Sequence, residues 1–236
     1  MPLSLQRKLT LLFNSNNNAP LFSGSLMADY DPAKETGALG SIATLTDQHG
    51  SYDGTAVGDP QLVLDSSGKR AVELDGTDDG YTLTDLGNDI ATNDDYCIAV
   101  AVRPLVASPF GNQWLFGGSG GSVSDNLHLG YKDQDNLGLH HWNDDIADTF
   151  SYSQNRLDIL VFNQTSAGGR TIYANGATVA TGAYDELTSN NGWAMARRSN
   201  GGNFANVRIL RCLVYRGLTT SEFTSVHDWL DARYGE

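Results

Sequence analysis

The chain consists of short runs of alternating apolar and polar residues, which turn-forming residues interrupt at close intervals. Clusters of Gly, Asn, Asp and Ser separate the runs at the spacing typical of an antiparallel all-β domain. The runs 97–102 and 158–162 are apolar on both faces, which predicts central strands of a layered core. Asn175-Gly176 predicts a two-residue hairpin, because both turn positions need positive φ. The pattern therefore predicts a two-sheet antiparallel sandwich.

A helix is expected at the end of the chain. Thr219 and Glu222 have the T-x-x-E spacing of a capping box, in which the two residues satisfy each other's free backbone donors. An apolar stripe with helical spacing follows, and this stripe predicts a helix that lies on the sandwich. Its members are Phe223, Val226, Trp229, Leu230 and Arg233.

Charge and cysteine content restrict the class of partner. The 236 residues include 28 Asp and Glu against 15 Lys and Arg, a net charge of −13, so the surface repels phosphate backbones and we expect no nucleic-acid partner. No apolar run approaches the roughly 20 residues of a membrane span, so we expect no membrane insertion. Cys97 and Cys212 lie inside apolar runs, which predicts two buried free thiols. No Sec-type export signal is recognisable, and we expect synthesis in a cytoplasm.

Residues 1–26 are expected to form an apolar arm and linker ahead of a domain over 27–236. The apolar residues of the arm follow the spacing of one face of a short helix, and residues 14–20 form an Asn-rich linker that ends in proline. That face consists of Leu5, Leu9, Leu12 and Phe13. Two hypotheses stay open: the face packs back on the body, or it anchors the protein on a partner or a second copy.

Several segments match, in order, a pattern found in one family. The segment 28–32 (ADYDP) has the form of an opening strand motif, and 45–50 (LTDQHG) that of W-x-D-x-S-G with Leu in place of Trp. The segment 72–79 (VELDGTDD) matches F-D-G-x-D-D closely. Later strands and an ending of the type R-x-L-S-x-x-E correspond to 159–162, 171–176 and 207–222. Over 27–236 the chain thus resembles the laminin-G-like, concanavalin-A-like jelly-roll domains, especially versions common in bacteriophage virion proteins and bacterial surface proteins.

The resemblance implies an all-β jelly-roll sandwich and leaves the arm unmatched. We therefore expect a jelly roll with an N-terminal arm and a short C-terminal helix. The resemblance implies several functions, because members of the family include lectins, adhesion modules, glycosidases and structural virion parts. Our leading hypothesis is a non-enzymatic bacteriophage virion surface protein, a capsid decoration or tail-associated module that binds glycans. Its partners would be other virion proteins or copies of itself, and cell-surface glycans. A bacterial carbohydrate-binding adhesin or lectin, and a glycoside hydrolase, are the alternatives.

One polar and aromatic cluster has the composition of a glycan site, because indole rings stack on sugar CH faces while polar side chains bond the hydroxyls. Its members are His140, His141, Trp142, Asn143, Asp144 and Asp145. Strand alternation directs His140 and Trp142 to one face and His141 to the other. A core position for Trp142 is the competing interpretation, and Trp114 and Trp193 are expected in the core. Arg197 and Arg198 form the one concentrated basic spot and could meet an acidic sugar.

Two acidic groupings remain. One grouping could supply oxygen ligands for calcium, the possible cofactor: Asp75, Asp78 and Asp79, with Asp94 and Asp95 as further candidates. The competing interpretation is that these residues lie in solvated turns.

Glu73 and Asp75 superficially match the carboxylate pair of jelly-roll glycosidases. The final carboxylate, however, falls on a loop, and Val72 and Leu74 are expected in the core with Glu73 solvated. We therefore predict no catalytic residues.

Overall fold

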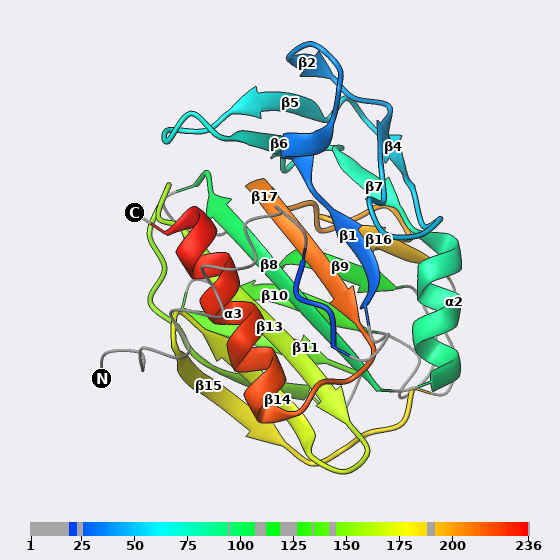
Figure 1. The fold of residues 1–236 in the computed structure, drawn as a ribbon, viewed down its shortest axis with the longest axis vertical. Helices are drawn as coiled ribbons and strands as arrows, with labels where there is room; N and C mark the ends of the chain where they lie inside the picture. Colours follow the sequence, from blue (N-terminus) through cyan, green and yellow to red (C-terminus); the bar gives the residue numbers. More distant parts are fainter. Residues whose placement is uncertain are drawn as a thin grey trace.

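The computed structural model describes residues 19–22, 26–93, 95–106, 112–118, 127–133, 135–141, 145–187 and 192–235. Within these residues almost all regular structure is β-strand, arranged in two antiparallel sheets that pack face to face (Figure 1). The predicted sandwich is therefore confirmed. None of the helices in the described ranges has an apolar stretch long enough to cross a bilayer.

The first sheet contains the longest strands and has the order β15-β14-β13-β8-β17-β6-β5-β2, with β1 also paired to β17. The strands of this sheet are β1 (Leu26–Tyr30), β2 (Gly40–Ser41), β5 (Gln61–Leu64), β6 (Arg70–Asp75), β8 (Tyr96–Pro104), β13 (Asp158–Thr165), β14 (Gly169–Ala174), β15 (Ala177–Gly182) and β17 (Asn206–Tyr215). Asn175 and Gly176 connect β14 to β15 with φ values of 48° and 86°, which confirms the predicted hairpin.

The second sheet has the order β12-β11-β10-β9-β16-β7-β4-β3. Its strands are β3 (Thr44–Leu45), β4 (Gly54–Val57), β7 (Gly80–Thr82), β9 (Gln113–Gly118), β10 (His128–Asp133), β11 (Asn136–His140), β12 (Asp145–Thr149) and β16 (Trp193–Met195).

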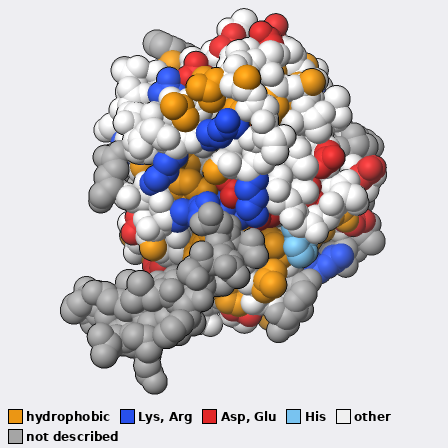
Figure 2. All heavy atoms as spheres, turned by 45° about the horizontal axis from the view of Figure 1, so that its top comes forward, with side chains coloured by type: hydrophobic (Ala, Val, Ile, Leu, Met, Phe, Trp, Pro, Cys, Tyr) orange, Lys and Arg blue, Asp and Glu red, His pale blue; other side chains and the backbone are white. Residues whose placement is uncertain are grey.

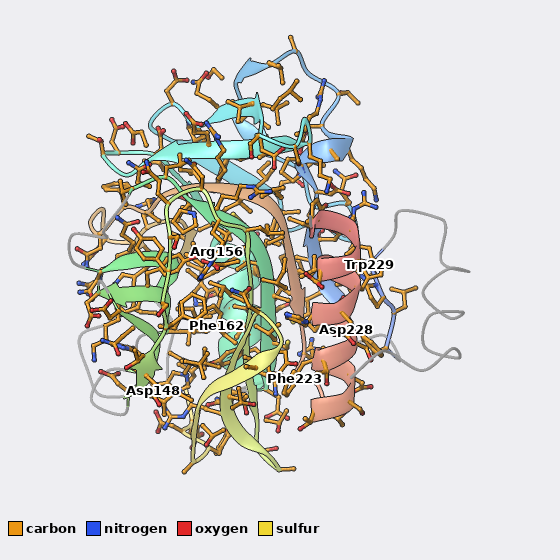
Figure 3. All side chains as sticks on the ribbon, turned by 90° about the vertical axis from the view of Figure 1, so that its left-hand side faces the viewer. Asp148, Arg156, Phe162, Phe223, Asp228 and Trp229 are labelled. Carbon is orange, nitrogen blue, oxygen red and sulfur yellow. The ribbon has the colours of Figure 1, made fainter. Side chains whose placement is uncertain are left out.

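Two hydrophobic layers explain why the central strands are apolar on both faces. On β8, Ile98 and Val100 enter the core between the sheets, whereas Cys97 and Ala99 belong to a second core beneath α3 (Thr220–Tyr234). Figure 3 shows α3 along the outer face of the first sheet, with the second sheet on the opposite side. Cys97 and Cys212 are buried free thiols, as predicted.

The C-terminal helix begins as the sequence predicts. Glu222 accepts hydrogen bonds from the backbone N–H of Thr219 at 2.9 Å and from its hydroxyl at 2.8 Å. Phe223 and Trp229 are buried against the first sheet, so the predicted apolar stripe is confirmed.

A second helix, α2 (Thr84–Asn93), was not expected. Leu83, Leu86 and Ile90 bury one side of this segment in the main core, and their spacing of three and four residues is the signal that could have revealed the helix.

Acidic residues of the motifs that resemble the family bind backbone N–H groups and an arginine. Asp47 in the 45–50 segment accepts the backbone N–H groups of Asp29, His49 and Gly50 at 2.9, 3.0 and 3.0 Å. Asp29 and Asp31 bind the buried guanidinium of Arg211 at 2.6 and 2.7 Å. Opposite charges at these distances tie β1 and the single-turn η1 (Pro32–Lys34) to β17.

Part of the expected linker, residues 19–22, packs against the body. Ala19 is buried in the core beneath α3, the carbonyl of Pro20 accepts the hydroxyl of Tyr215 at 3.2 Å, and Phe22 lies 6.2 Å from the Tyr215 ring. The proposed anchoring residues Leu5, Leu9, Leu12 and Phe13 lie outside the described residues.

Charge is unevenly distributed over the surface. Figure 2 shows lysine and arginine side chains gathered in the middle of one face, with acidic side chains mainly toward its edges. The charged side chains are therefore not evenly spread, and an acidic protein with a net charge of −13 still has positive regions on its surface.

Candidate functional site

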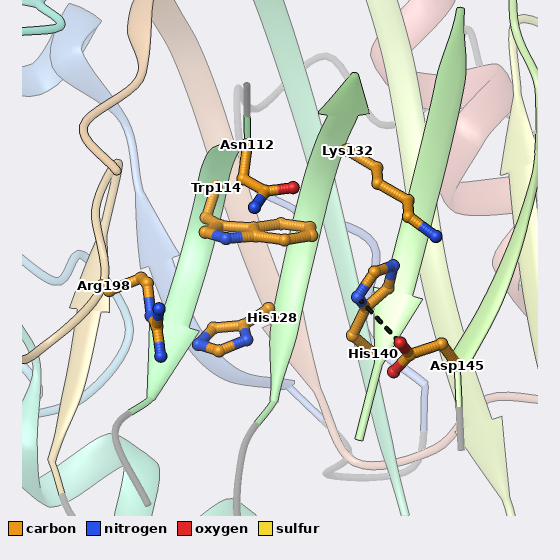
Figure 4. A pocket seen from close by; sticks show the side chains of 7 residues that line it. All are labelled: Asn112, Trp114, His128, Lys132, His140, Asp145 and Arg198. Carbon is orange, nitrogen blue, oxygen red and sulfur yellow. Dashed lines mark ion pairs between the residues drawn. The ribbon is translucent and has the colours of Figure 1, made fainter. Parts of the chain in front are cut away.

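A polar pocket lies on the outer face of the second sheet (Figure 4), and we call it the outer pocket. It encloses about 280 Å³, at the small end of the range for small-molecule sites. The residues that line it are Asn112, Trp114, His128, Lys132, His140, Asp145 and Arg198.

Strand alternation brings the two histidines together. On β10 and β11 the core receives Leu129 and Leu139, so their neighbours His128 and His140 face outward. The two histidines are partners in the β10–β11 register, which places their side chains next to each other on one face.

A β-bulge directs Trp114 into the same place. The β9–β10 register shifts so that Phe116 pairs with Leu129 while Trp114 pairs with Gly130, and Leu115 is the extra residue. Leu115 and Phe116 consequently both enter the core, and Trp114 faces outward. Trp114 belongs to neither hydrophobic core, although it is only 2% exposed.

The indole forms a wall of the outer pocket. Trp114 stacks on His128 with ring centroids 5.2 Å apart and contacts His140 edge-on at 4.9 Å. Because His128 covers one face of the indole and little of the ring is exposed, Trp114 holds the imidazoles in position rather than offering an open stacking platform.

Two glycines provide the space that the site needs. A Cβ at position 138 would lie 2.5 Å from Nε2 of His140, so glycine lets this ring lie flat on β11. A Cβ on Gly117 would lie 2.7 Å from the carbonyl oxygen of Arg197, so glycine also lets the chain leading to Arg198 pass close to β9.

Both imidazoles are neutral at pH 7. Burial and the positive charge of Arg198 lower the pKa of His128 to about 4, and burial and Lys132 lower the pKa of His140 to about 4. Nδ1 of His140 lies 3.3 Å from a carboxylate oxygen of Asp145, which favours the tautomer with its proton on Nδ1. Nε2 of His128 lies 3.1 Å from the carbonyl oxygen of Gly118 and donates to it, so its Nδ1 is an acceptor.

Two polar atoms at the outer pocket are buried without a hydrogen-bond partner in the described part of the chain. They are Nε2 of His140 and Nε of Arg198. A buried donor or acceptor that stays unsatisfied costs about 1–3 kcal/mol. Such atoms are tolerated where a ligand or water completes the bonds.

The predicted glycan cluster divides between two locations. His140 and Arg198 line the outer pocket. His141 faces the interior, is fully buried, and bonds the Tyr96 hydroxyl at 2.8 Å and Asp185 at 3.1 Å. Trp142, Asn143 and Asp144 lie outside the described residues.

Arg197 is adjacent to the outer pocket in sequence but is used inside the protein. It is 6% exposed and donates to the Thr82 hydroxyl at 3.0 Å and to the Arg198 carbonyl at 3.1 Å. Its guanidinium therefore fixes the segment that presents Arg198.

Sequence reasoning found His140, Asp145 and Arg198 but missed four members of the site. These are Asn112, Trp114, His128 and Lys132. The available signal was the outward position of His128 and Lys132 in HLGYKD, beside the outward His140 of the next strand. The expectation that Trp193 is a core residue is confirmed.

The three aspartates proposed for calcium do meet. One oxygen from each of Asp75, Asp78 and Asp79 lies within 4.8 Å of the others. Asp75 accepts the N–H of Thr77 at 2.7 Å, and Asp79 accepts that of Asp59 at 2.7 Å, so these carboxylates already stabilise turns. The group could supply part of the six to eight oxygens that calcium takes, and calcium binding stays a prediction.

The other acidic candidates lie elsewhere or outside the described residues. Asp95 accepts the N–H of Ser166 at 2.7 Å, and Asp94 is not described. Glu73 binds Nε of Arg208 at 2.6 Å, while Val72 and Leu74 are buried as expected.

A comparison with protein-family profiles identifies the superfamily of this chain. The profile of the concanavalin A-like lectin/glucanases superfamily matches residues 75–222, which is more than half of the chain. The chain belongs to this superfamily. A search among curated proteins found no match.

Several solved structures have a similar fold at low sequence identity. A Trypanosoma rangeli sialidase in complex with sialic acid matches 96% of the chain with a TM-score of 0.67 and 15% identity, and the chain spans 37% of that enzyme. Domain 4 of AbnA, a GH43 extracellular arabinanase from Geobacillus stearothermophilus in complex with arabinotriose, matches 87% of the chain and 98% of the domain (TM-score 0.66, 17% identity). A botulinum neurotoxin type C structure, whose cell entry depends on two ganglioside molecules, matches 87% of the chain and 51% of its own (TM-score 0.62, 16% identity). At these identities the fold is shared, by enzymes and by binding modules alike.

Proposed function

We propose that the protein binds carbohydrate in the outer pocket and that it is not an enzyme. The observation that carries the proposal is the pocket itself, in which imidazole, amide, carboxylate and cationic groups surround a buried indole. Such convergent polar groups in a concave site suit the hydroxyls of a sugar. Solved structures with a similar fold, in complex with sialic acid and with arabinotriose, support the same ligand class.

The lining of the outer pocket favours binding over hydrolysis. Most glycosidases place two carboxyl groups at the scissile bond. The two groups are about 5–5.5 Å apart in retaining enzymes and about 6.5–9.5 Å apart in inverting enzymes. Among the described residues that line the pocket, Asp145 is the one carboxylate, and it faces Nδ1 of His140. Glu73, the acidic residue considered for catalysis, is paired with Arg208 on the first sheet.

A glycan array and titration calorimetry test this proposal. The purified protein should bind a defined set of glycans, and His140→Gln should weaken that binding while leaving the melting temperature at pH 7 nearly unchanged. His49→Gln, at an exposed histidine, is the matched control. Repeating the array with calcium and with EDTA tests the aspartate group separately. An array without any bound glycan would refute carbohydrate binding.

We further propose that the protein acts on a bacteriophage virion, where the arm anchors it to other virion proteins or to copies of the same chain. The family resemblance supports it, together with the packing of Ala19–Phe22 on the body, which would give an anchored arm a fixed base. A bacterial adhesin is the alternative, since it would use the same glycan site.

The buried residues next to the arm decide which truncation can test the anchoring role. Because Ala19 and Leu26 are buried, removal of residues 1–26 would damage the body, whereas removal of 1–18 spares them. The shorter truncation should keep the melting temperature and the glycan binding of the full chain but lose particle assembly. Normal assembly of the truncated protein would refute the anchoring role.

A further inference from the structure

The outer pocket contains two cationic side chains, those of Arg198 and Lys132. Several arginines elsewhere bind carboxylates: the pairs are Arg103–Asp65, Arg156–Asp158, Arg208–Glu73 and Arg211–Asp29, at 2.6–3.2 Å. Neither Arg198 nor Lys132 has a carboxylate partner among the described residues, in a chain with 28 acidic residues. Both side chains can therefore contact an anionic ligand in the pocket.

The charge of the outer pocket is positive on a negative protein. Its neutral histidines contribute no charge at pH 7, so Arg198 and Lys132 stand against the single carboxylate of Asp145. Asp145 lies beside His140, whereas Arg198 lies beside His128 at the opposite side of the indole (Figure 4). The Arg198 side of the pocket thus has no acidic lining residue among those described.

The position of Arg198 is fixed by its backbone. Its N–H donates to the carbonyl of Gly202 at 2.9 Å, and its own carbonyl accepts from Gly201 at 3.1 Å and from Arg197 at 3.1 Å. The backbone that carries the guanidinium is thus already ordered, and the planar N–H groups of the guanidinium match the two oxygens of a carboxylate.

We propose that the outer pocket selects a sugar residue that carries an anionic group, with Arg198 as the main anion ligand and Lys132 as the second. The inference rests on the proposed carbohydrate binding and names the ligand class of the same site. A carboxylate and a sulfate ester present the same chemistry of anionic oxygens, so matched pairs of sugars distinguish these two sources.

The experiment is titration calorimetry of the full chain with sugars that differ only in charge. The first set is glucuronic acid, its methyl ester and glucose, and the second is N-acetylglucosamine 6-sulfate and N-acetylglucosamine. A charge-assisted contact predicts a preference of roughly 10- to 100-fold for the anionic member of at least one set. The preference should shrink as salt is raised, because the cations are partly exposed to solvent.

Three variants locate the effect. Arg198→Gln should remove most of the preference and Lys132→Gln a smaller part, while binding of the neutral sugar changes little. Arg216→Gln removes the same charge at an exposed arginine outside the pocket and should leave the preference intact. If Arg198→Gln lowers the melting temperature, Lys132→Gln alone still tests the prediction.

Failure of the anionic specificity and failure of carbohydrate binding give different results. Equal binding of charged and neutral sugars would overturn the anionic specificity and leave carbohydrate binding intact. A preference that falls equally in Arg198→Gln and Arg216→Gln would overturn the site, since it would reflect only the overall charge. No binding of any sugar in the panel, or on the glycan array, would overturn both proposals.

Discussion

The two neutral histidines of the outer pocket make the stability of the protein depend on pH. Burial is the main cause that lowers the pKa of both His128 and His140 to about 4. An unfolded histidine titrates near about 6.5, so between these values the unfolded chain binds a proton that the folded chain rejects. Stability is therefore lost as the pH falls from about 6.5 to about 4, and no such loss occurs above that window.

The size of this effect follows from the two pKa values. A histidine with a folded pKa of about 4 and an unfolded pKa of about 6.5 contributes a loss of about 2 kcal/mol between pH ~7 and pH ~4.5. For a protein of this size, about 2 kcal/mol corresponds to roughly 4–8 °C in melting temperature. Buried carboxyls with a raised pKa, such as Asp158, act in the opposite direction, so only a comparison with variants isolates the histidines.

His128→Gln and His140→Gln each replace an imidazole by an amide that does not titrate. Urea unfolding of the wild type and of each variant at pH ~7 and pH ~4.5 gives the four free energies needed per comparison. Each variant should lose about 2 kcal/mol less than the wild type on acidification, whatever its stability at neutral pH. The exposed His49→Gln is the control. Equal acid losses in the wild type and in both pocket variants would refute the reasoning.

Three further changes test other parts of the structure. Gly138→Ala should abolish ligand binding in calorimetry with little change in circular dichroism, because its Cβ would lie 2.5 Å from His140 Nε2; unchanged affinity would contradict the site geometry. Arg211→Met should cost about 3–5 kcal/mol in urea unfolding, because two buried carboxylates lose their cation, and a cost below ~1 kcal/mol would argue against that network. Glu73→Gln should cost less than about 1 kcal/mol, since its pair with Arg208 is partly exposed, and should leave glycan binding unchanged; a loss of binding would contradict the assignment.

Much of the fold could be predicted from local patterns. The hairpin at Asn175-Gly176 needs only two turn residues with positive φ, and the helix start at Thr219 needs only a partner three residues later. Strands apolar on both faces indicated that layers would cover both sides of the first sheet. The helix α2 was missed because its apolar side, formed by residues such as Leu86 and Ile90, is short and lies between strand-like runs.

The site could be predicted only in part, because it depends on contacts between strands. Alternation correctly separated His140 from His141, since that rule acts within one strand. The pairing of His128 with His140 depends on the register between β10 and β11, which the sequence does not display. Two histidines separated by eleven residues gave no signal until that register was known.

Trp114 shows why composition alone misassigned the site. A large aromatic in a strand is usually a core residue, and Trp114 is indeed buried, which agrees with that rule. The bulge at Leu115 rotates it to the outer face, where the histidines bury it instead of the core. One inserted residue in one strand thus converts a core position into the wall of a pocket. Because the imidazoles are neutral where they pack on that wall, Arg198 and Lys132 are the positive charges that a ligand meets in the pocket.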